Sequence, residues 1–383
     1  MFIAPIVAES RVPPLASSTG PVSSAWARKS GGGRDASRPP PDFLAQADET
    51  GPVDDASGGT RDSATIGAMN TRLEALLVAQ GGVCTAAQTR SCEISEADLA
   101  AAVRRGELVR VRRDAFVAGS RWSVATPEGR LALRAKAVML GRPRSVASHQ
   151  SALALHQLPL WSVELDRVDL MIETPRVRRR GGLRLHPRQG APTARAQGMP
   201  VLPVATAVVQ VALERGVVAG LVPLDAALRA DRCSLEDVAA SLATLASTPL
   251  RRRCGEQLLR LADPACESVG ETRTRLLLHD MGLPYETQVE VTDQAGRFVG
   301  RVDFVVLGKV VVEFDGLVKY EGIEGRAALA AEKRREDALR GLGYGVARLV
   351  WSDLDDPRRV AELIAIALAA ASRPGNGARA GKP

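Results

Sequence analysis

Aromatic side chains are scarce in this sequence: Phe, Trp and Tyr together make up 3% of its 383 residues. Proteins that bind single-stranded nucleic acid without sequence preference stack bases on aromatic rings, so this composition argues against a stacking platform. No stretch approaches the roughly 18 uncharged apolar residues of a membrane-spanning helix, and we expect no membrane contact. The opening residues, MFIAPIVAES, have no basic residue before their short apolar patch, which makes them a poor signal peptide.

The cysteines and histidines also lack the spacing of a metal site. No CxxC pair and no zinc-type spacing with histidine occurs among Cys84, Cys92, Cys233, Cys254 and Cys266. We therefore predict free thiols in a reducing cytoplasm. His149 and His156 are seven residues apart, not at the i,i+4 spacing of paired ligands, and a core or capping role is expected for both.

Positive charge is what the sequence has in excess, with a net charge of +7 in which arginine greatly outnumbers lysine. That balance suits a polyanion such as nucleic acid. The length predicts two or three domains. The fold expected is a multidomain α/β protein with an N-terminal winged helix-turn-helix, a mixed α+β middle region and a C-terminal α/β domain.

Residues 1–68 have almost no periodic apolar pattern and are rich in Pro, Gly, Ser, Ala and Asp. Such a segment cannot bury enough apolar surface to offset chain entropy, so we predict a disordered leader. Met69 directly precedes the first clean helical pattern, and it is a candidate translation start that would make the leader an over-extended gene model. Residues 373–383 are predicted to be a disordered tail.

Three short helices and a basic hairpin are predicted within residues 69–122. The first helix ends at Gly81-Gly82, while Thr85 and Ser95 open the next two. The alternating run LVRVRRDAFV then predicts a β-hairpin. This order is that of a winged helix-turn-helix, whose third helix enters the major groove of double-stranded DNA. The residues expected to contact the phosphate backbone are Arg104, Arg105, Arg110, Arg112 and Arg113. A small helical domain that binds protein and has a solvated basic face is the alternative.

The middle region, residues 125–245, has a mixed pattern. Helices are predicted at 127–140, in SHQSALALHQLPL, at 205–214 and at 224–230, and strands at 168–172 and 182–186. An arginine run separates the two strands: Arg176, Arg178, Arg179 and Arg180. We interpret it either as a solvated loop or as an extension of the DNA-binding track.

Residues 263–372 are predicted to form one α/β unit in the order α-β-β-β-α-β-α. Its most informative stretch is GRVDFVVLGKVVVEFDGLVKY, residues 300–320, where carboxylates interrupt two apolar strands. Period-two alternation puts Val302, Phe304 and Val306 on one face and Asp303 on the other. With a three-residue hairpin loop, Val306 pairs with Val310.

That register places Asp303 directly across from Glu313 and Arg301 across from Asp315. Two facing carboxylates are destabilising without a cation, and Mg²⁺ held by hard oxygen ligands is the economical solution. The alternative is that the acids are solvated on an exposed sheet face and that Arg301 pairs with Asp315.

Two family resemblances add to these patterns. The stretch LLVAQGGVCTAAQTRSCEISEADLAAAVRRGELVRVRRDAFVA, with SHQSALALHQLPL and VPLDAALR further on, resembles antitoxins of the AbiEi type. This resemblance implies a winged helix followed by a second antitoxin domain, with a toxin as a candidate partner.

The second resemblance is to the PD-(D/E)XK endonuclease-like superfamily, and more closely to Vsr-like domains fused behind AbiEi-type domains in actinobacterial proteins. It rests on ESVGETRTRLLL, GRVDF, VVVEFDGLVKY and EKRREDALRGLGYGVARLVWSDL. It implies that Asp303 and Glu313 hold Mg²⁺ or Mn²⁺, with Glu271 as the early-helix acid and Glu267 one turn before it.

One position departs from the family pattern, because Asp315 stands where a lysine usually polarises the attacking water. Lys319 or Lys333 is expected to supply the missing charge. The implied reaction is metal-assisted phosphodiester hydrolysis. The residues expected to bind the DNA backbone there are Arg273, Arg275, Lys333, Arg334 and Arg335.

Two functions therefore remain open. The first is a nuclease that a winged helix delivers to DNA. The second is a non-enzymatic, antitoxin-like regulator whose degenerate endonuclease fold serves as a nucleic-acid or homodimer platform.

Overall fold

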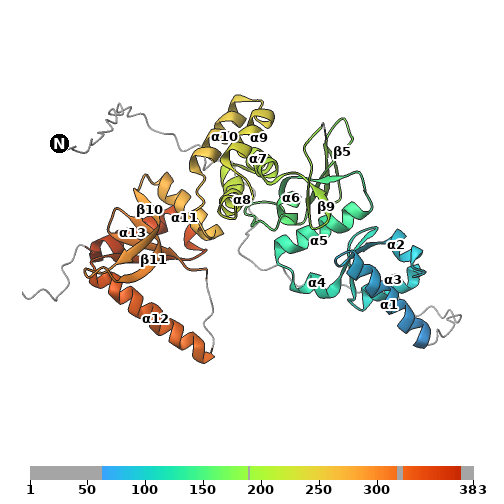
Figure 1. Ribbon diagram of the computed structural model, residues 1–383, viewed down its shortest axis with the longest axis horizontal. Coiled ribbons are helices and arrows are strands. Elements are labelled where there is room, and N and C mark those ends of the chain that lie inside the picture. The colour runs from blue at the N-terminus through green and yellow to red at the C-terminus, as the bar shows by residue number, and fades with distance from the viewer. Residues whose placement is uncertain (1–62, 189, 317–321, 372–383) are drawn as a thin grey trace, which may run out of the picture. The chain divides into compact units, whose positions relative to one another are not determined.

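The computed structural model describes residues 63–188, 190–316 and 322–371, which form a mixed α/β protein with three sheets within those ranges (Figure 1). The first helix, α1 (Ser63–Ala79), begins inside the predicted disordered leader, so residues 63–68 are helical. The rest of the leader and the predicted tail lie outside the described residues. None of the helices described is long and apolar enough to cross a membrane. All five cysteines are free, as predicted.

The first elements after α1 occur in the predicted order. They are β1 (Val83–Thr85), α2 (Ala86–Ser91), α3 (Glu96–Arg104), β2 (Leu108–Arg112) and β3 (Ala115–Ala118). Thr85 and Ser95 each cap a helix through a reciprocal capping box, with Gln88 and Asp98 respectively, which confirms both predicted helix starts. The strands form a three-stranded antiparallel sheet in the order β1-β3-β2.

The middle region is built around a six-stranded sheet in the order β6-β7-β5-β4-β9-β8. Its strands are β4 (Val146–Ala147), β5 (Val168–Ile172), β6 (Arg178–Arg180), β7 (Leu183–Pro187), β8 (Ala194–Ala196) and β9 (Met199–Val201). Its helices are α4 (Gly119–Val124), α5 (Pro127–Leu140), α6 (His149–Leu155), α7 (Val204–Arg215), α8 (Val217–Arg229), α9 (Leu235–Leu245) and α10 (Pro249–Leu261).

The bounds of α5 and β5 match the sequence prediction. Three of the four arginines of the run do not lie in a loop, because Arg178–Arg180 is strand β6, paired antiparallel with β7, while Arg176 lies in the bend before it. Strands β4, β8 and β9 escaped prediction because two or three residues are too few to display a period of two.

One hydrophobic core runs through the first two predicted domains and extends into the third. Val83 and Val117 of the three-stranded sheet pack in the same cluster as Leu131 of α5, and this cluster continues to Leu258 of α10 and Leu276. The sequence boundary at residues 122–125 is therefore not a packing boundary.

A buried ion pair ties α8 to the first helix of the C-terminal unit, α11 (Val269–Asp280). The Arg275 guanidinium lies 2.8 Å from an Asp225 carboxylate oxygen, and the two side chains are 3% and 1% exposed. Asp225 also accepts hydrogen bonds from the Thr272 hydroxyl and the Asp263 backbone N–H. Arg275 is thus buried in an ion pair, and the prediction that it contacts the DNA backbone is wrong.

The C-terminal unit confirms the predicted α-β-β-β-α-β-α order, with one added 3₁₀ turn at Asp353–Asp355. After α11 come β10 (Tyr285–Thr292), β11 (Phe298–Val306), β12 (Val310–Phe314), α12 (Gly322–Gly341), β13 (Gly345–Leu349) and α13 (Pro357–Ala371). Strands β10 to β12 are antiparallel neighbours, and β13 joins β12 in parallel.

Helices cover both faces of this sheet. On one face Leu278 of α11 and Ile364 of α13 share a core with Phe304 and Val312. On the other face Leu339 of α12 packs with Val305 and Val311. The loop after β11 has positive φ at Leu307 and Gly308, and Val306 pairs with Val310 as predicted.

The predicted strict alternation along β11 is wrong at one point. Phe304 belongs to the α11/α13 face, whereas Val302, two residues earlier, packs with Val305 on the α12 face. The β10–β11 ladder is interrupted between these residues, since Gln288, opposite Asp303, has φ +51°. The backbone is therefore irregular at Asp303, the first candidate acid.

Candidate functional site

Asp303 lies where strands β11 and β12 separate. Their ladder ends at the pair Phe304–Val312, one residue short of the predicted Asp303–Glu313 pair. There the Asp303 carboxylate oxygen Oδ2 accepts a hydrogen bond from the backbone N–H of Phe314 at 2.8 Å. The aspartate thus accepts a hydrogen bond from a backbone N–H that the strand ladder does not pair, and this bond orients its side chain.

Glu271 approaches from the first turn of α11 and is 7% exposed. Its Oε2 accepts hydrogen bonds from the Gln288 side chain at 2.8 Å and from the Glu267 backbone N–H at 2.9 Å. Glu267 precedes Ser268, the N-cap of α11, so its predicted place one helical turn before Glu271 is wrong. The Glu267 carboxylate instead forms an ion pair with Arg301 at 2.8 Å.

Glu313, on β12, is 8% exposed and is held by guanidinium groups. Arg335 of α12 binds both of its carboxylate oxygens, at 2.8 and 3.1 Å, and Arg348 of β13 lies 3.6 Å from Oε2. Arg335 also forms an ion pair with Glu332 at 2.7 Å. Arg335, predicted to contact the DNA backbone, therefore neutralises Glu313 instead.

Glu271 and Glu313 both lie near enough to Asp303 to affect its ionisation. The pKa of Asp303 is raised to about 6, chiefly by burial and also by the nearby Glu271 and Glu313 carboxylates, while the Phe314 hydrogen bond and Arg335 lower it. A carboxylate in such surroundings favours binding either a proton or a cation.

The remaining residues predicted for this site are spread more widely. Asp315 is partly buried, and its backbone N–H donates to the Leu349 carbonyl at 2.8 Å. Lys319 lies outside the described residues. Lys333 and Arg334 are exposed on α12. Arg273 is 10% exposed, with its guanidinium 4.1 Å from the Trp161 ring centroid and bonded to Asp355 at 2.7 Å.

The arginines predicted to contact DNA in the N-terminal part are mostly exposed. Arg104 ends α3, Arg105 pairs with Glu107, and Arg113 occupies the turn between β2 and β3. The Arg110 guanidinium lies 5.2 Å from the Phe116 ring centroid. Arg112 is partly buried and donates hydrogen bonds to the carbonyls of Arg180 and Gly181, across to the turn between β6 and β7.

The donor chemistry at Asp303 suits the predicted Mg²⁺ or Mn²⁺, because all three acids offer hard oxygen ligands. A cation there must share Glu313 with Arg335 and Arg348. Among the described residues, the group whose ligand atoms all lie within 4.8 Å of one another is His149, His186 and Glu214, and the three acids around Asp303 do not form such a group. Sequence reasoning missed this group because its members come from three separate elements. His156 is buried with Nε2 2.9 Å from the Leu202 carbonyl, which agrees with its predicted core role.

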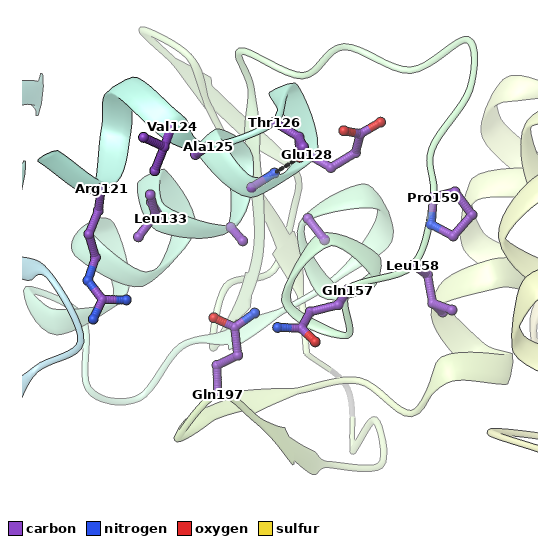
Figure 2. A pocket seen from close by; sticks show the side chains of 13 residues that line it. Arg121, Val124, Ala125, Thr126, Glu128, Leu133, Gln157, Leu158, Pro159 and Gln197 are labelled. Atoms are coloured by element: carbon purple, nitrogen blue, oxygen red, sulfur yellow. Dashed lines mark hydrogen bonds between the residues drawn. The ribbon is translucent and has the colours of Figure 1, made fainter. Parts of the chain in front are cut away.

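A cavity of about 630 Å³ lies apart from all these residues, between the start of α5 and the end of α6 (Figure 2). Its lining has one charged side chain of each sign, Arg121 and Glu128, and contains none of the predicted site residues. We assign no function to it.

The chain therefore folds as a mixed α/β protein with several sheets. No protein-family model matches the chain. Over 199 residues it is 33% identical to two uncharacterized proteins of Mycobacterium tuberculosis, MT2308 and Rv2248. The alignment covers 50% of this chain and 69% of each relative. The chain belongs to the family of these mycobacterial proteins.

The raised pKa of Asp303 predicts a pH-dependent stability effect. Its ordinary value is 3.8 and its folded value is about 6, so the folded state holds this proton more tightly than the unfolded state between those values. The free energy of unfolding should therefore fall as pH rises through this window, by at most about 3 kcal/mol above pH 6. Asp303→Asn stays neutral and still accepts the Phe314 hydrogen bond. In urea denaturation without divalent metal, we expect it to be more stable than wild type at pH 7.5 and equal to it near pH 4.

Asp280→Asn, at an exposed acid in the same unit, is the matched control and should show no such pH-dependent gain. A stability difference between Asp303→Asn and wild type that is the same at both pH values would contradict the electrostatic account.

Proposed function

We propose that this protein binds double-stranded DNA and that its C-terminal unit is a metal-dependent phosphodiesterase with an endonuclease-like fold. The observation that carries the proposal is that Glu271 and Glu313 lie near enough to Asp303 to raise the pKa of its carboxyl group, at the point where β11 and β12 separate. A divalent cation would offset the repulsion between these neighbouring carboxylates.

The N-terminal elements support a winged helix-turn-helix. Helix α3 would be the recognition helix, and the β2–β3 hairpin would be a short wing along the phosphates. The hydrogen bonds from Arg112 to Arg180 and Gly181 bring the β6–β7 hairpin beside this wing. All three arginines of β6 are exposed, which favours interpreting the arginine run as an extension of the DNA-binding track.

At the C-terminal site, Asp303, Glu313 and Glu271 would hold Mg²⁺ or Mn²⁺. When bound, the ion would neutralise charge on the phosphodiester and lower the pKa of the attacking water. Asp303 is oriented by the Phe314 N–H, and Glu271 by Gln288 and the Glu267 N–H. The exposed cations Lys333 and Arg334 on α12 would contact the DNA backbone. Arg273 is left out of this surface because Trp161 and Asp355 already engage it.

A second function is favoured by one observation, which is that Arg335 and Arg348 already neutralise Glu313. A guanidinium in place of a metal ion, with Asp315 where the endonuclease pattern has lysine, suits a non-enzymatic DNA-binding regulator. Such a regulator would use the C-terminal unit as a platform for a toxin or for a second copy of the chain. Both proposals include a reducing cytoplasmic setting, in keeping with the five free cysteines.

Cleavage of supercoiled plasmid by the purified full chain tests the nuclease proposal. With Mg²⁺ or Mn²⁺ we expect relaxation by wild type and loss of at least about a hundredfold in rate for Asp303→Ala and Glu313→Ala, because each removes charge stabilisation at the reacting phosphate. Glu290→Gln, at an exposed acid on β10, should keep wild-type activity. Metal-independent relaxation, or equal rates in all four proteins, would contradict the nuclease and leave the regulator.

Duplex binding as a function of salt tests the DNA-binding track. Replacing Arg178, Arg179 and Arg180 together with glutamine should weaken binding to all sequences about equally. It should also reduce the magnitude of the slope of log K against log salt by about 2 to 3, since up to three phosphate contacts are lost. The measurement is a fluorescence anisotropy titration at several salt concentrations.

The matched control replaces Arg251, Arg252 and Arg253, three exposed arginines of α10, with glutamine and so removes the same charge elsewhere. An equal loss of affinity and of salt dependence in the two triple variants would mean that DNA binding depends on net charge alone. The β2–β3 and β6–β7 hairpins would then have no specific role in it.

A further inference from the structure

Two histidines and a glutamate from three separate elements meet in the middle region. His149 begins α6, His186 lies on β7 and Glu214 lies near the end of α7. One ligand atom from each lies within 4.8 Å of the other two. Both histidines are buried, at 5% and 6% exposure, and their rings stack with centroids 4.1 Å apart.

The backbone holds His149 in a conformation that costs energy. Its φ is +50°, in the left-handed region that a residue with a side chain rarely adopts, and such a conformation persists only where the surroundings enforce it. Its N–H donates to the Gln210 side chain at 3.0 Å, and its ring Nδ1 lies 3.0 Å from the Ser148 hydroxyl. These contacts leave Nε2 as the nitrogen that faces Glu214, 3.7 Å away.

His186 is oriented by a buried carboxylate. Its Nε2 lies 2.7 Å from Asp169, which is 0% exposed and also accepts hydrogen bonds from Gln150 and Arg167. With the Nε2 proton donated to Asp169, the lone pair of the ring is on Nδ1. A carboxylate behind a histidine in this way is the usual support of a metal-binding imidazole.

The His149–Glu214 distance is close to that between two ligand atoms of a tetrahedral zinc site, and every pair of ligand atoms in the group lies within 4.8 Å. Bonds of about 2.0–2.1 Å place the ligand atoms of such a site roughly 3.4 Å apart, near the 3.7 Å between His149 and Glu214. Glu214 is also bonded by Arg184, with Nη1 2.7 Å from Oε2, so an ion bound at Oε1 would compete with only one of the two guanidinium contacts. The three residues line a cavity of about 700 Å³, which leaves room for a fourth ligand.

We propose that His149, His186 and Glu214 bind one Zn²⁺ ion, with the fourth coordination position open to this cavity. Two imidazoles and one carboxylate favour zinc over the Mg²⁺ expected at Asp303, because imidazole is a poor ligand for Mg²⁺. Three protein ligands with an open position are the arrangement of reactive zinc sites, whereas structural sites are closed by four. The proposal does not depend on the nuclease or DNA-binding functions.

Zinc titration of the chelator-treated full chain tests this site, with a chromophoric chelator as competitor. We expect one tight site per chain in wild type and at least about tenfold weaker binding in Glu214→Gln, which keeps the side-chain volume but removes the anionic ligand. Glu164→Gln removes the charge of another arginine-paired glutamate and should bind like wild type. Co²⁺ in place of Zn²⁺ should give tetrahedral absorption without a thiolate charge-transfer band, which excludes the five cysteines as ligands.

Arg184→Gln separates a metal site from a purely structural cluster. Removing the guanidinium that competes for Glu214 should tighten zinc binding several-fold, even though it removes an ion pair from the folded protein. Three results would each overturn the proposal: no zinc binding by wild type, equal zinc affinity in Glu214→Gln and Glu164→Gln, or weaker binding in Arg184→Gln.

Discussion

The hydrogen bond from the Phe314 N–H to the Asp303 carboxylate fixes the geometry of the candidate site in the C-terminal unit. The β11–β12 ladder includes Phe304 but not Asp303. The Asp303 carboxylate accepts the hydrogen bond of the Phe314 N–H, which a longer ladder would have paired with β11. The positive φ of Gln288 interrupts β10 opposite the same residue and lets the Gln288 amide reach Glu271. The β11–β12 ladder therefore ends next to Asp303, and Glu271 and Glu313 lie near enough to this carboxylate to affect its pKa.

Electrostatic balance decides what this acidic site can do. Glu271 and Glu313 both disfavour ionised Asp303, while Arg335 lies between Glu313 and Glu332 and lowers the cost of that charge. A divalent cation and Arg335 would thus compete for Glu313, and their relative affinities separate an enzyme from a regulator. The histidine cluster around His149 differs in kind, because its nitrogen ligands suit a softer ion than the oxygen ligands around Asp303.

Local sequence signals predicted much of the fold. Capping at Thr85 and Ser95, the ends of α5, and the Val306–Val310 register all depend on neighbours in sequence. Long-range contacts were not predictable in this way: Arg275 was expected to contact the DNA backbone, but its partner Asp225 is 50 residues away and buried with it. The partners of His149 and Arg112 likewise lie on distant elements. Of the candidate site, the identities of the acids followed from sequence, whereas their neutralisation by Arg335 and Arg348 did not.

We expect the acids around Asp303 to bind a divalent cation in competition with Arg335. Electron paramagnetic resonance of Mn²⁺ measures this competition, using the full chain with the Glu214→Gln change so that the histidine cluster does not contribute. Mn²⁺ should bind more weakly to Asp303→Asn and more tightly to Arg335→Gln. Mn²⁺ affinity that is unchanged by Asp303→Asn, or lowered by Arg335→Gln, would show that no such competition exists.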